Sequence, residues 1–244
     1  MFVGRETYPA WGNLIGAVRT GTPAFDATFG MSTWEYRARN PEAGQLFFAF
    51  LAALTAPDAP AILEAYDFSR LRQIADIGGG TGTLLQAILR AHPASTGVLF
   101  DTPTTIDHAR SQFSAAGLLD RSQLVGGDFL EEVPSGADVY VLSHILHDWD
   151  EVACRRILRS CRAAMGPAGR LLVVERVLPE RVDGPSPAVF LDLMMLVMER
   201  GRERTEREYR ALFAAEDLSL TRVIPTASPT GISVLEVELP AGAG

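Results

Sequence analysis

The chain has 244 residues, 47% of them apolar, and a net charge of −8, which suits one main core and excludes the clustered basic surface that nucleic acid requires. It contains no lysine, which excludes a P-loop lysine and Schiff-base chemistry. No run reaches the roughly 18 uninterrupted apolar residues of a membrane span, and the N-terminus lacks a signal peptide's apolar run, so we expect a cytoplasmic protein without membrane or nucleic-acid partners.

Residues 1–65 have the pattern of helices with turns and no strand pattern, with a break between Pro57 and Pro60. We expect this helical segment to act as a linker that covers the sheet or the site. The main domain is predicted over residues 66–240. Two strand-like runs near its end, 218–224 and 232–239, are joined by the turn-rich TASPTG rather than by a helix. They predict a closing hairpin with one antiparallel strand.

Between residue 71 and the hairpin, short apolar runs alternate with amphipathic stretches, which predicts an α/β fold with helices on both faces of a mostly parallel sheet. The expected strands are 72–77, 97–101, 123–125, 139–142 and 170–175. The expected helices are 83–91, 105–116 and 151–165, the last capped by Asp150, and Thr205 with Glu208 has capping-box spacing for a further helix. Cys154 and Cys161 share one face of a predicted helix, and we expect both to be core residues.

A glycine-rich turn follows the first of these strands in ADIGGGTGTLL, residues 75–85. Such a turn lets backbone amides approach a ligand, although glycines also make tight turns that bind nothing. The spacing is G-x-G-x-G, with Thr83 where a dinucleotide enzyme has its third glycine, which disfavours a nicotinamide-dependent oxidoreductase. Asp101 ends the next strand, where a carboxylate can accept both hydroxyls of a ribose.

A third acidic residue, Asp128, follows the next strand with Phe129 beside it. Together they could bond the exocyclic amine of an adenine and cover its ring. An ordinary turn with a buried Phe is the alternative.

The order of these motifs resembles the small-molecule O-methyltransferases of bacterial secondary metabolism and their plant phenylpropanoid and flavonoid relatives. The resemblance is carried by DIGGGTG, GVLFD, GGDF, LHDWDE, GRLLVVERVLP and GRERTEREY, in register over most of the chain. It implies a Rossmann-like sheet of seven strands, S-adenosylmethionine as cofactor, and methyl transfer to a hydroxyl of a small aromatic or polyketide metabolite. Residues 66–240 would then be the methyltransferase domain.

The resemblance also assigns the residues of the site. Those implied to bind the cofactor are Gly78, Gly79, Gly80, Asp101, Gly127, Asp128, Phe129 and Ser143. The general base falls on His147, and its flanking acidic residues fall on Glu175 and Glu203. No metal is implied.

A general base suits this reaction because a phenol, with a pKa of about 10, is neutral at pH 7, and an imidazole with a pKa near 6.5 can take its proton. A carboxylate on the second ring nitrogen would fix the tautomer. The alternative for His147 is a structural residue at the start of a helix. For the substrate we expect Asp148 and Asp192 to bond a hydroxyl and Met195 to line a wall, with core packing as the alternative for the methionine.

Two features depart from the family pattern. Ser143 stands where the plant enzymes carry a lysine, and most of the family's N-terminal dimerisation domain has no counterpart in the sequence. Residues 1–65 would be its remnant, so we expect apolar surface near residues 1–55 and a weakened homodimer. Two alternatives stay open: a relative repurposed for hydroxylation, decarboxylation or cyclisation, and an inactive truncated homologue.

Overall fold

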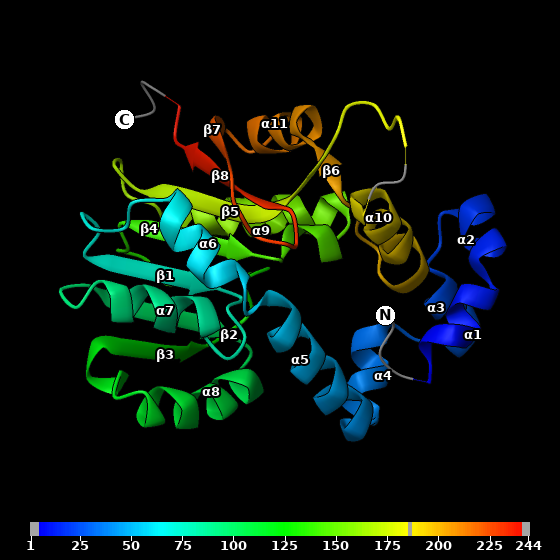
Figure 1. Cartoon of the computed structure of the whole chain (residues 1–244), viewed down its shortest axis with the longest axis horizontal. Helices are drawn as coiled ribbons and strands as arrows, with labels where there is room; N and C mark the ends of the chain where they lie inside the picture. The colour runs from blue at the N-terminus through cyan, green and yellow to red at the C-terminus, as the bar shows by residue number, and fades with distance from the viewer. Residues whose placement is uncertain (1–4, 185–186, 241–244) are drawn as a thin grey trace.

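A central sheet with helices on both faces forms the body of the protein (Figure 1). The computed structural model describes residues 5–184 and 187–240. The strands run in the spatial order β3-β2-β1-β4-β5-β8-β7, and a short β6 pairs with β5 outside this path. Their bounds are β1 Gln73–Ile77, β2 Thr96–Asp101, β3 Ser122–Gly126, β4 Val139–Ser143, β5 Arg170–Leu178, β6 Arg204–Thr205, β7 Ser219–Pro225 and β8 Ile232–Glu238.

The strands β1 to β5 pair in parallel, and β8 pairs antiparallel with both β5 and β7. The expected α/β class, the strand positions and the closing hairpin are therefore confirmed. The pairing of β6 with β5 (Val177 with Arg204) was not expected, because two residues are too few to give a strand pattern. The seven strands of the main path match the seven predicted, and β6 adds an eighth.

Each face of the sheet is covered by helices that the sequence pattern predicts. One face packs against α6 (Asp58–Ala65), α7 (Thr83–Ala91) and α8 (Pro103–Ala115). The other packs against α9 (Glu151–Ala164) and α11 (Glu206–Ala214), where Cys154 and Cys161 are fully buried and not disulfide-bonded, as expected. Asp150 caps α9, and Thr205 with Glu208 closes the predicted capping box of α11.

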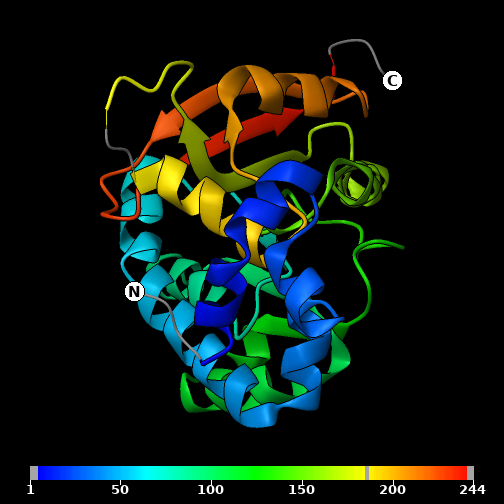
Figure 2. The ribbon, with the colours of Figure 1, turned by 90° about the vertical axis from the view of Figure 1, so that its right-hand side faces the viewer.

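The N-terminal segment is helical, as predicted. It forms α1 Thr7–Gly12, α2 Leu14–Thr20, α3 Ala24–Phe29, α4 Thr33–Arg39 and α5 Pro41–Thr55. Helices α1 to α3 pack on α10 (Pro187–Met198) through a separate apolar cluster that includes Phe25 and Met198 (Figure 2). Tyr8, Ile15 and Val18 are more than half exposed, which confirms the apolar surface expected near residues 1–55.

One helical stretch, Pro41–Ala65, is long and apolar enough by composition to cross a membrane, and a quarter of its most apolar 18-residue window is buried. A single helix of this kind is weak evidence for a span, because core helices pass the same test. Asp58 lies within the stretch, is 2% exposed, and bonds His144 and two hydroxyl groups of the β7–β8 turn. A carboxylate held in this way ties its end of the stretch to the sheet.

Candidate active site

The glycine turn after β1 lies at the carboxyl ends of the parallel strands, beside the ends of β2 and β4. Gly78 and Gly80 have φ values of 68° and 59°, a conformation that side chains disfavour. A Cβ on Gly79 would lie 2.5 Å from Cγ of Asp76, whereas one on Gly80 would meet nothing within 4 Å. The turn is thus packed closely against the strand at Gly79 and open at Gly80.

Asp101, at the end of β2, is fixed by two backbone amides. Its Oδ2 accepts a hydrogen bond of 2.9 Å from the Gly80 amide, and its Oδ1 accepts one of 2.7 Å from the Thr102 amide. Each carboxylate oxygen can accept more than one bond, so both keep capacity for a ligand. The glycine turn and this carboxylate, both expected to bind the cofactor, are therefore in contact.

Asp76, the residue before the last one of β1, is 1% exposed. Among the described residues neither of its oxygens has a hydrogen-bond partner. Burial and the charge of Asp101 raise its pKa to about 7. A buried carboxyl group left in this state favours a ligand that brings a hydrogen-bond donor or a positive charge.

The loop after β3 closes the same edge. The Gly127 amide donates to the carbonyl of Asp101 at 3.0 Å, and a Cβ on Gly127 would lie 2.6 Å from the Phe100 ring. Phe129 packs edge-on against Trp149, with their ring centroids 5.6 Å apart. Its ring also borders Gly78, because a Cβ on Gly78 would lie 3.2 Å from Cε1 of Phe129.

The two polar residues predicted beside this loop lie at the same edge. Asp128 is exposed, and its Oδ1 accepts from the Leu130 amide at 2.8 Å. Ser143 ends β4 and is half-buried.

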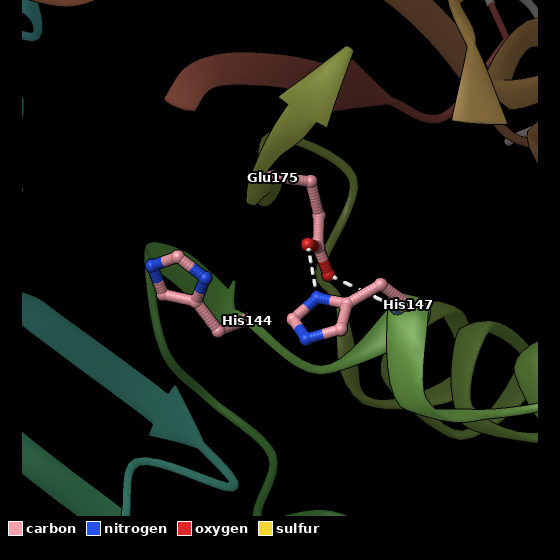
Figure 3. Close-up of side chains that lie close together, drawn as sticks. All are labelled: His144, His147 and Glu175. Carbon is pink, nitrogen blue, oxygen red and sulfur yellow. Dashed lines mark hydrogen bonds and ion pairs between the residues drawn. The ribbon is translucent and has the colours of Figure 1, made fainter. Parts of the chain in front are cut away.

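His147 and Glu175 form the tightest polar pair of the site (Figure 3). His147 lies in a short 3-10 turn, Leu146–Asp148, after β4, and Glu175 lies on the neighbouring β5. Nδ1 of His147 is 2.6 Å from Oε2 of Glu175, and the His147 amide donates to Oε1 at 3.3 Å. The predicted histidine and carboxylate therefore meet, although 28 residues separate them, because the parallel register pairs Ser143 at the end of β4 with Val174, the neighbour of Glu175.

The charges around His147 favour its protonated form. Burial alone would lower its pKa, but the negative charges of Glu175 and Asp148 raise the pKa to about 10. Burial likewise opposes the charge of Glu175, yet the imidazolium keeps the pKa of that carboxyl below its ordinary value. From the sequence we expect an imidazole with a pKa near 6.5, so the raised pKa differs from that expectation. The reason is that a carboxylate lies against each ring nitrogen: Glu175 against Nδ1, and Asp148, whose Oδ1 is 3.3 Å away, against Nε2.

Glu203 lies near this pair without bonding it in the described structure. It is 1% exposed, its Oε1 is 3.6 Å from Nη1 of Arg176, and its Oε2 has no partner among the described residues. Burial raises its pKa to about 7, although the charge of His147 opposes this. Asp192, on α10, accepts the Glu203 amide at 3.0 Å. The bond that Asp192 makes therefore positions the loop that carries Glu203.

Of the other predicted substrate residues, Asp148 borders Nε2 of His147, and burial raises its pKa. Met195 is 7% exposed, so most of its surface packs against protein. Both assignments stay predictions.

His144, His147 and Glu175 each offer a metal-ligand atom, and these three atoms lie within 4.8 Å of one another (Figure 3). Both histidines already use a ring nitrogen, because Nδ1 of His147 pairs with Glu175 and Nε2 of His144 pairs with Asp58 at 2.8 Å. The expectation of no metal stays a prediction.

Two residues of the site could not be identified from the sequence. Gly201 packs directly against the turn that carries His147, since a Cβ there would come within 1.9 Å of the His147 carbonyl oxygen. Its place in GRERT was the only available signal. Asp58 contacts His144 across 86 residues, and no motif surrounds it.

Comparisons with known proteins show the family of the chain. The family model of an O-methyltransferase domain matches residues 11–218. A phenazine O-methyltransferase from Lysobacter antibioticus is 47% identical over 233 residues, which are 96% of this chain and 67% of that protein. A mitomycin biosynthesis 6-O-methyltransferase from Streptomyces lavendulae is 40% identical over 88% of this chain and 61% of its own length.

Among solved structures, an O-methyltransferase of neocarzinostatin biosynthesis superposes with a TM-score of 0.85 at 34% identity, covering 94% of this chain and 68% of that one. It was crystallised with S-adenosyl-L-homocysteine and 1,4-dihydroxy-2-naphthoic acid. This chain thus spans about 61 to 68% of the length of the three proteins that it resembles here.

Proposed function

We propose that this chain, which belongs to the O-methyltransferase family, transfers the methyl group of S-adenosylmethionine to a phenolic hydroxyl of a small aromatic metabolite. The observation that carries the proposal is the buried pair of His147 and Glu175 beside the glycine turn. The relatives support the substrate class, because their names or ligands are a phenazine, a mitomycin and a dihydroxynaphthoic acid.

The residues at the strand ends fit the cofactor. Asp101 keeps acceptor capacity on both oxygens for the two ribose hydroxyls, and the space at Gly80 admits a ligand to the backbone. Asp76 supplies a buried carboxyl group that suits the cationic methionine portion. Phe129 and Asp128 border the position expected for the adenine. When bound, S-adenosylmethionine supplies a methyl group on a positively charged sulfur, which departs as a neutral thioether.

His147 is proposed to hold the proton of the acceptor. Its Nδ1 is committed to Glu175 at 2.6 Å, whereas Nε2 has the looser contact of 3.3 Å with Oδ1 of Asp148, so Nε2 is the nitrogen proposed to face the acceptor oxygen. As the oxygen–carbon bond forms, the phenol proton moves to Nε2, and Glu175 and Asp148 stabilise the resulting imidazolium. Because the neighbouring carboxylates raise its pKa, His147 is a stronger base than an ordinary imidazole, which favours its taking the proton of a phenol.

The same raised pKa means that the free site is protonated at pH 7. The complex of His147 with the acceptor can then also form from an imidazolium and a phenolate. This pair contains the same number of protons as an imidazole with a phenol. In either form Nε2 faces the acceptor oxygen across one proton. Alignment of that oxygen supplies a large part of the rate, since a well-oriented pair can gain about 7 to 11 kcal/mol.

Methyl transfer can be tested directly with S-adenosylmethionine labelled in its methyl group. The chain is incubated with hydroxyphenazines, dihydroxynaphthoic acids and simple phenols, and the products are analysed by mass spectrometry. The expected result is label on a hydroxyl of at least one fused-ring phenol. Cofactor binding by calorimetry with no transfer to any acceptor in the panel would contradict the proposal and favour a repurposed or inactive relative.

A further inference from the structure

A single carboxylate joins three parts of the chain next to the catalytic turn. Asp58 is the first residue of α6 and is 2% exposed. Its Oδ2 lies 2.8 Å from Nε2 of His144. Its Oδ1 accepts hydrogen bonds from the hydroxyls of Ser228 and Thr230, the latter at 2.6 Å. A helix, the loop after β4 and the turn between β7 and β8 are therefore tied together at one point.

The backbone of His144 has a conformation that side chains rarely adopt. Its φ is 57°, and Asp217 is the only other described non-glycine residue with a positive φ. Such a conformation is unfavourable for an L-residue and persists only where surrounding contacts hold it. The His144 amide still donates to the carbonyl of Val174 at 3.0 Å, so the left-handed turn comes immediately after the last β4–β5 contact.

The left-handed turn at His144 sets the positions of the three residues that follow it. Ile145 follows it and packs over the glycine turn, since a Cβ on Gly78 would lie 2.6 Å from Cδ1 of Ile145. His147 comes two residues later, and its ring lies 5.9 Å from the ring of His144 in an edge-on arrangement. A change in φ at His144 would therefore move the imidazole of His147 relative to Glu175 and to the cofactor turn.

We propose that Asp58 is a positioning residue for His147, and that it acts through the ring of His144 by holding the left-handed turn that presents the catalytic imidazole. Without the carboxylate, the His144 ring loses the hydrogen bond that compensates for its backbone strain. The proposal rests on the proposed function only where the rate of methyl transfer is the readout. If Asp58 acts in this way, the geometry of the site depends on α6, the helix that connects the N-terminal helices to the sheet.

The first test uses variants of both residues. Asp58→Ala is expected to lower kcat by about 10- to 100-fold, as a small misplacement of reacting groups does, with KM for both substrates within about 2-fold. His144→Ala should lower it similarly, whereas His144→Gly should lose less, because glycine adopts a positive φ without strain. Ser228→Ala removes one bond to the same carboxylate without touching His144, and it is the matched control with nearly unchanged kcat.

The double variant separates the proposed route from a general loss of stability. Once His144→Gly has removed the strain, Asp58→Ala should cost little more, so the two effects should not multiply. If Asp58→Ala costs the same factor in both backgrounds, Asp58 does not act through His144 and the proposal is overturned. Circular dichroism of each variant at the assay temperature shows whether it is folded.

The second test needs no methyl transfer. The proton between Nδ1 of His147 and Glu175 should give a downfield proton NMR signal, which is assigned by its loss in His147→Gln. Asp58→Ala should shift or broaden this signal, and Ser228→Ala should leave it in place. An unchanged signal in folded Asp58→Ala overturns the positioning role whether or not the chain transfers methyl groups. A displaced signal in a chain that methylates no acceptor supports the positioning role and contradicts only the proposed function.

Discussion

Nδ1 of His147 lies 2.6 Å from Oε2 of Glu175, which is fully buried on the neighbouring strand. The pairing commits one ring nitrogen to the protein, and the proposed mechanism assigns the other, Nε2, which lies 3.3 Å from Oδ1 of Asp148, to the acceptor. A hydrogen bond from a charged group contributes more than a neutral one, about 1.5 to 3 kcal/mol, and burial adds to the cost of removing either partner. Glu175 therefore orients His147 and, together with Asp148, raises its basicity.

Replacing Glu175 with Gln should show how much the charge of Glu175 contributes to methyl transfer. The amide oxygen can still accept the Nδ1 proton, but the charge is lost, so methyl transfer should fall by roughly 10- to 150-fold, equivalent to about 1.5 to 3 kcal/mol. Cofactor affinity should be preserved. Single-turnover rates and calorimetric titration check both expectations, and Glu180→Gln, an exposed carboxylate on the next loop, is the control. Equal rates in the Glu175→Gln and control variants would remove Glu175 from the mechanism.

The raised pKa of His147 predicts how stability varies with pH. In the unfolded chain a histidine titrates near pH 6.5, whereas in the folded protein its pKa is about 10. The stabilisation is therefore fully present below about pH 6.5 and is lost as the pH rises through about 10. Urea unfolding of the parent and of His147→Gln should differ most below pH 6.5, with the difference shrinking toward pH 10. Because the pKa of Glu175 is lowered, acid should weaken the pair as well. A difference that grows between pH 7 and 10 would contradict the folded-state charge assigned to His147.

Asp101 should contribute to cofactor affinity without supporting the fold. Asp101→Ala removes a carboxylate that the Gly80 and Thr102 amides hold in place, and S-adenosylmethionine binding should weaken by about 1.5 to 3 kcal/mol. Isothermal titration calorimetry measures this loss. Asp107→Ala, at an exposed position on α8, should bind as the parent does. Parental affinity in a folded Asp101→Ala variant would exclude Asp101 from the cofactor site.

Gly201 should be sensitive to a single methyl group. A Cβ at this position would come within 1.9 Å of the His147 carbonyl oxygen and 2.5 Å of the Trp149 amide nitrogen. Because these are backbone atoms, Gly201→Ala must move the catalytic turn, and overpacking of this kind costs about 1 to 3 kcal/mol. The melting temperature and the rate of methyl transfer should both fall. Gly166→Ala, where a Cβ meets nothing within 4 Å, should change neither. A Gly201→Ala variant with the parental rate and stability would contradict this prediction, because it would show that the turn carrying His147 can move without cost.

Local signals in the sequence were enough to predict most of the fold. Residues 83–91 form the helix expected from their apolar spacing, and Thr205 with Glu208 forms the expected capping box. These features depend on residues only a few positions apart. The pairing of β6 with β5 depends on two residues that tertiary contacts hold in place, so it has no sequence signal.

The site was predictable only where a motif marks it. His147 and Glu175 lie in recognisable segments, and parallel pairing of β4 and β5 brings them together. The protonation state was not predictable, because it depends on carboxylates that lie against both ring nitrogens in space. Asp58 was not predictable either, since its partners are 86 and 170 residues away.

The role of His147 as the group that takes the acceptor's proton is the central claim, and one comparison tests it most directly. Single-turnover methyl transfer by the parent and by His147→Gln is measured at pH 7 with two matched phenols, one neutral and one whose nitro group leaves it ionised. With the neutral phenol the variant should lose about 10² to 10⁴ in rate, the usual contribution of a general base, with unchanged cofactor affinity. With the ionised phenol it should lose far less, because no proton remains to be taken. A variant that keeps the parental rate on the neutral phenol would show that His147 is structural, and equal losses on both phenols would show that it does not act through the proton.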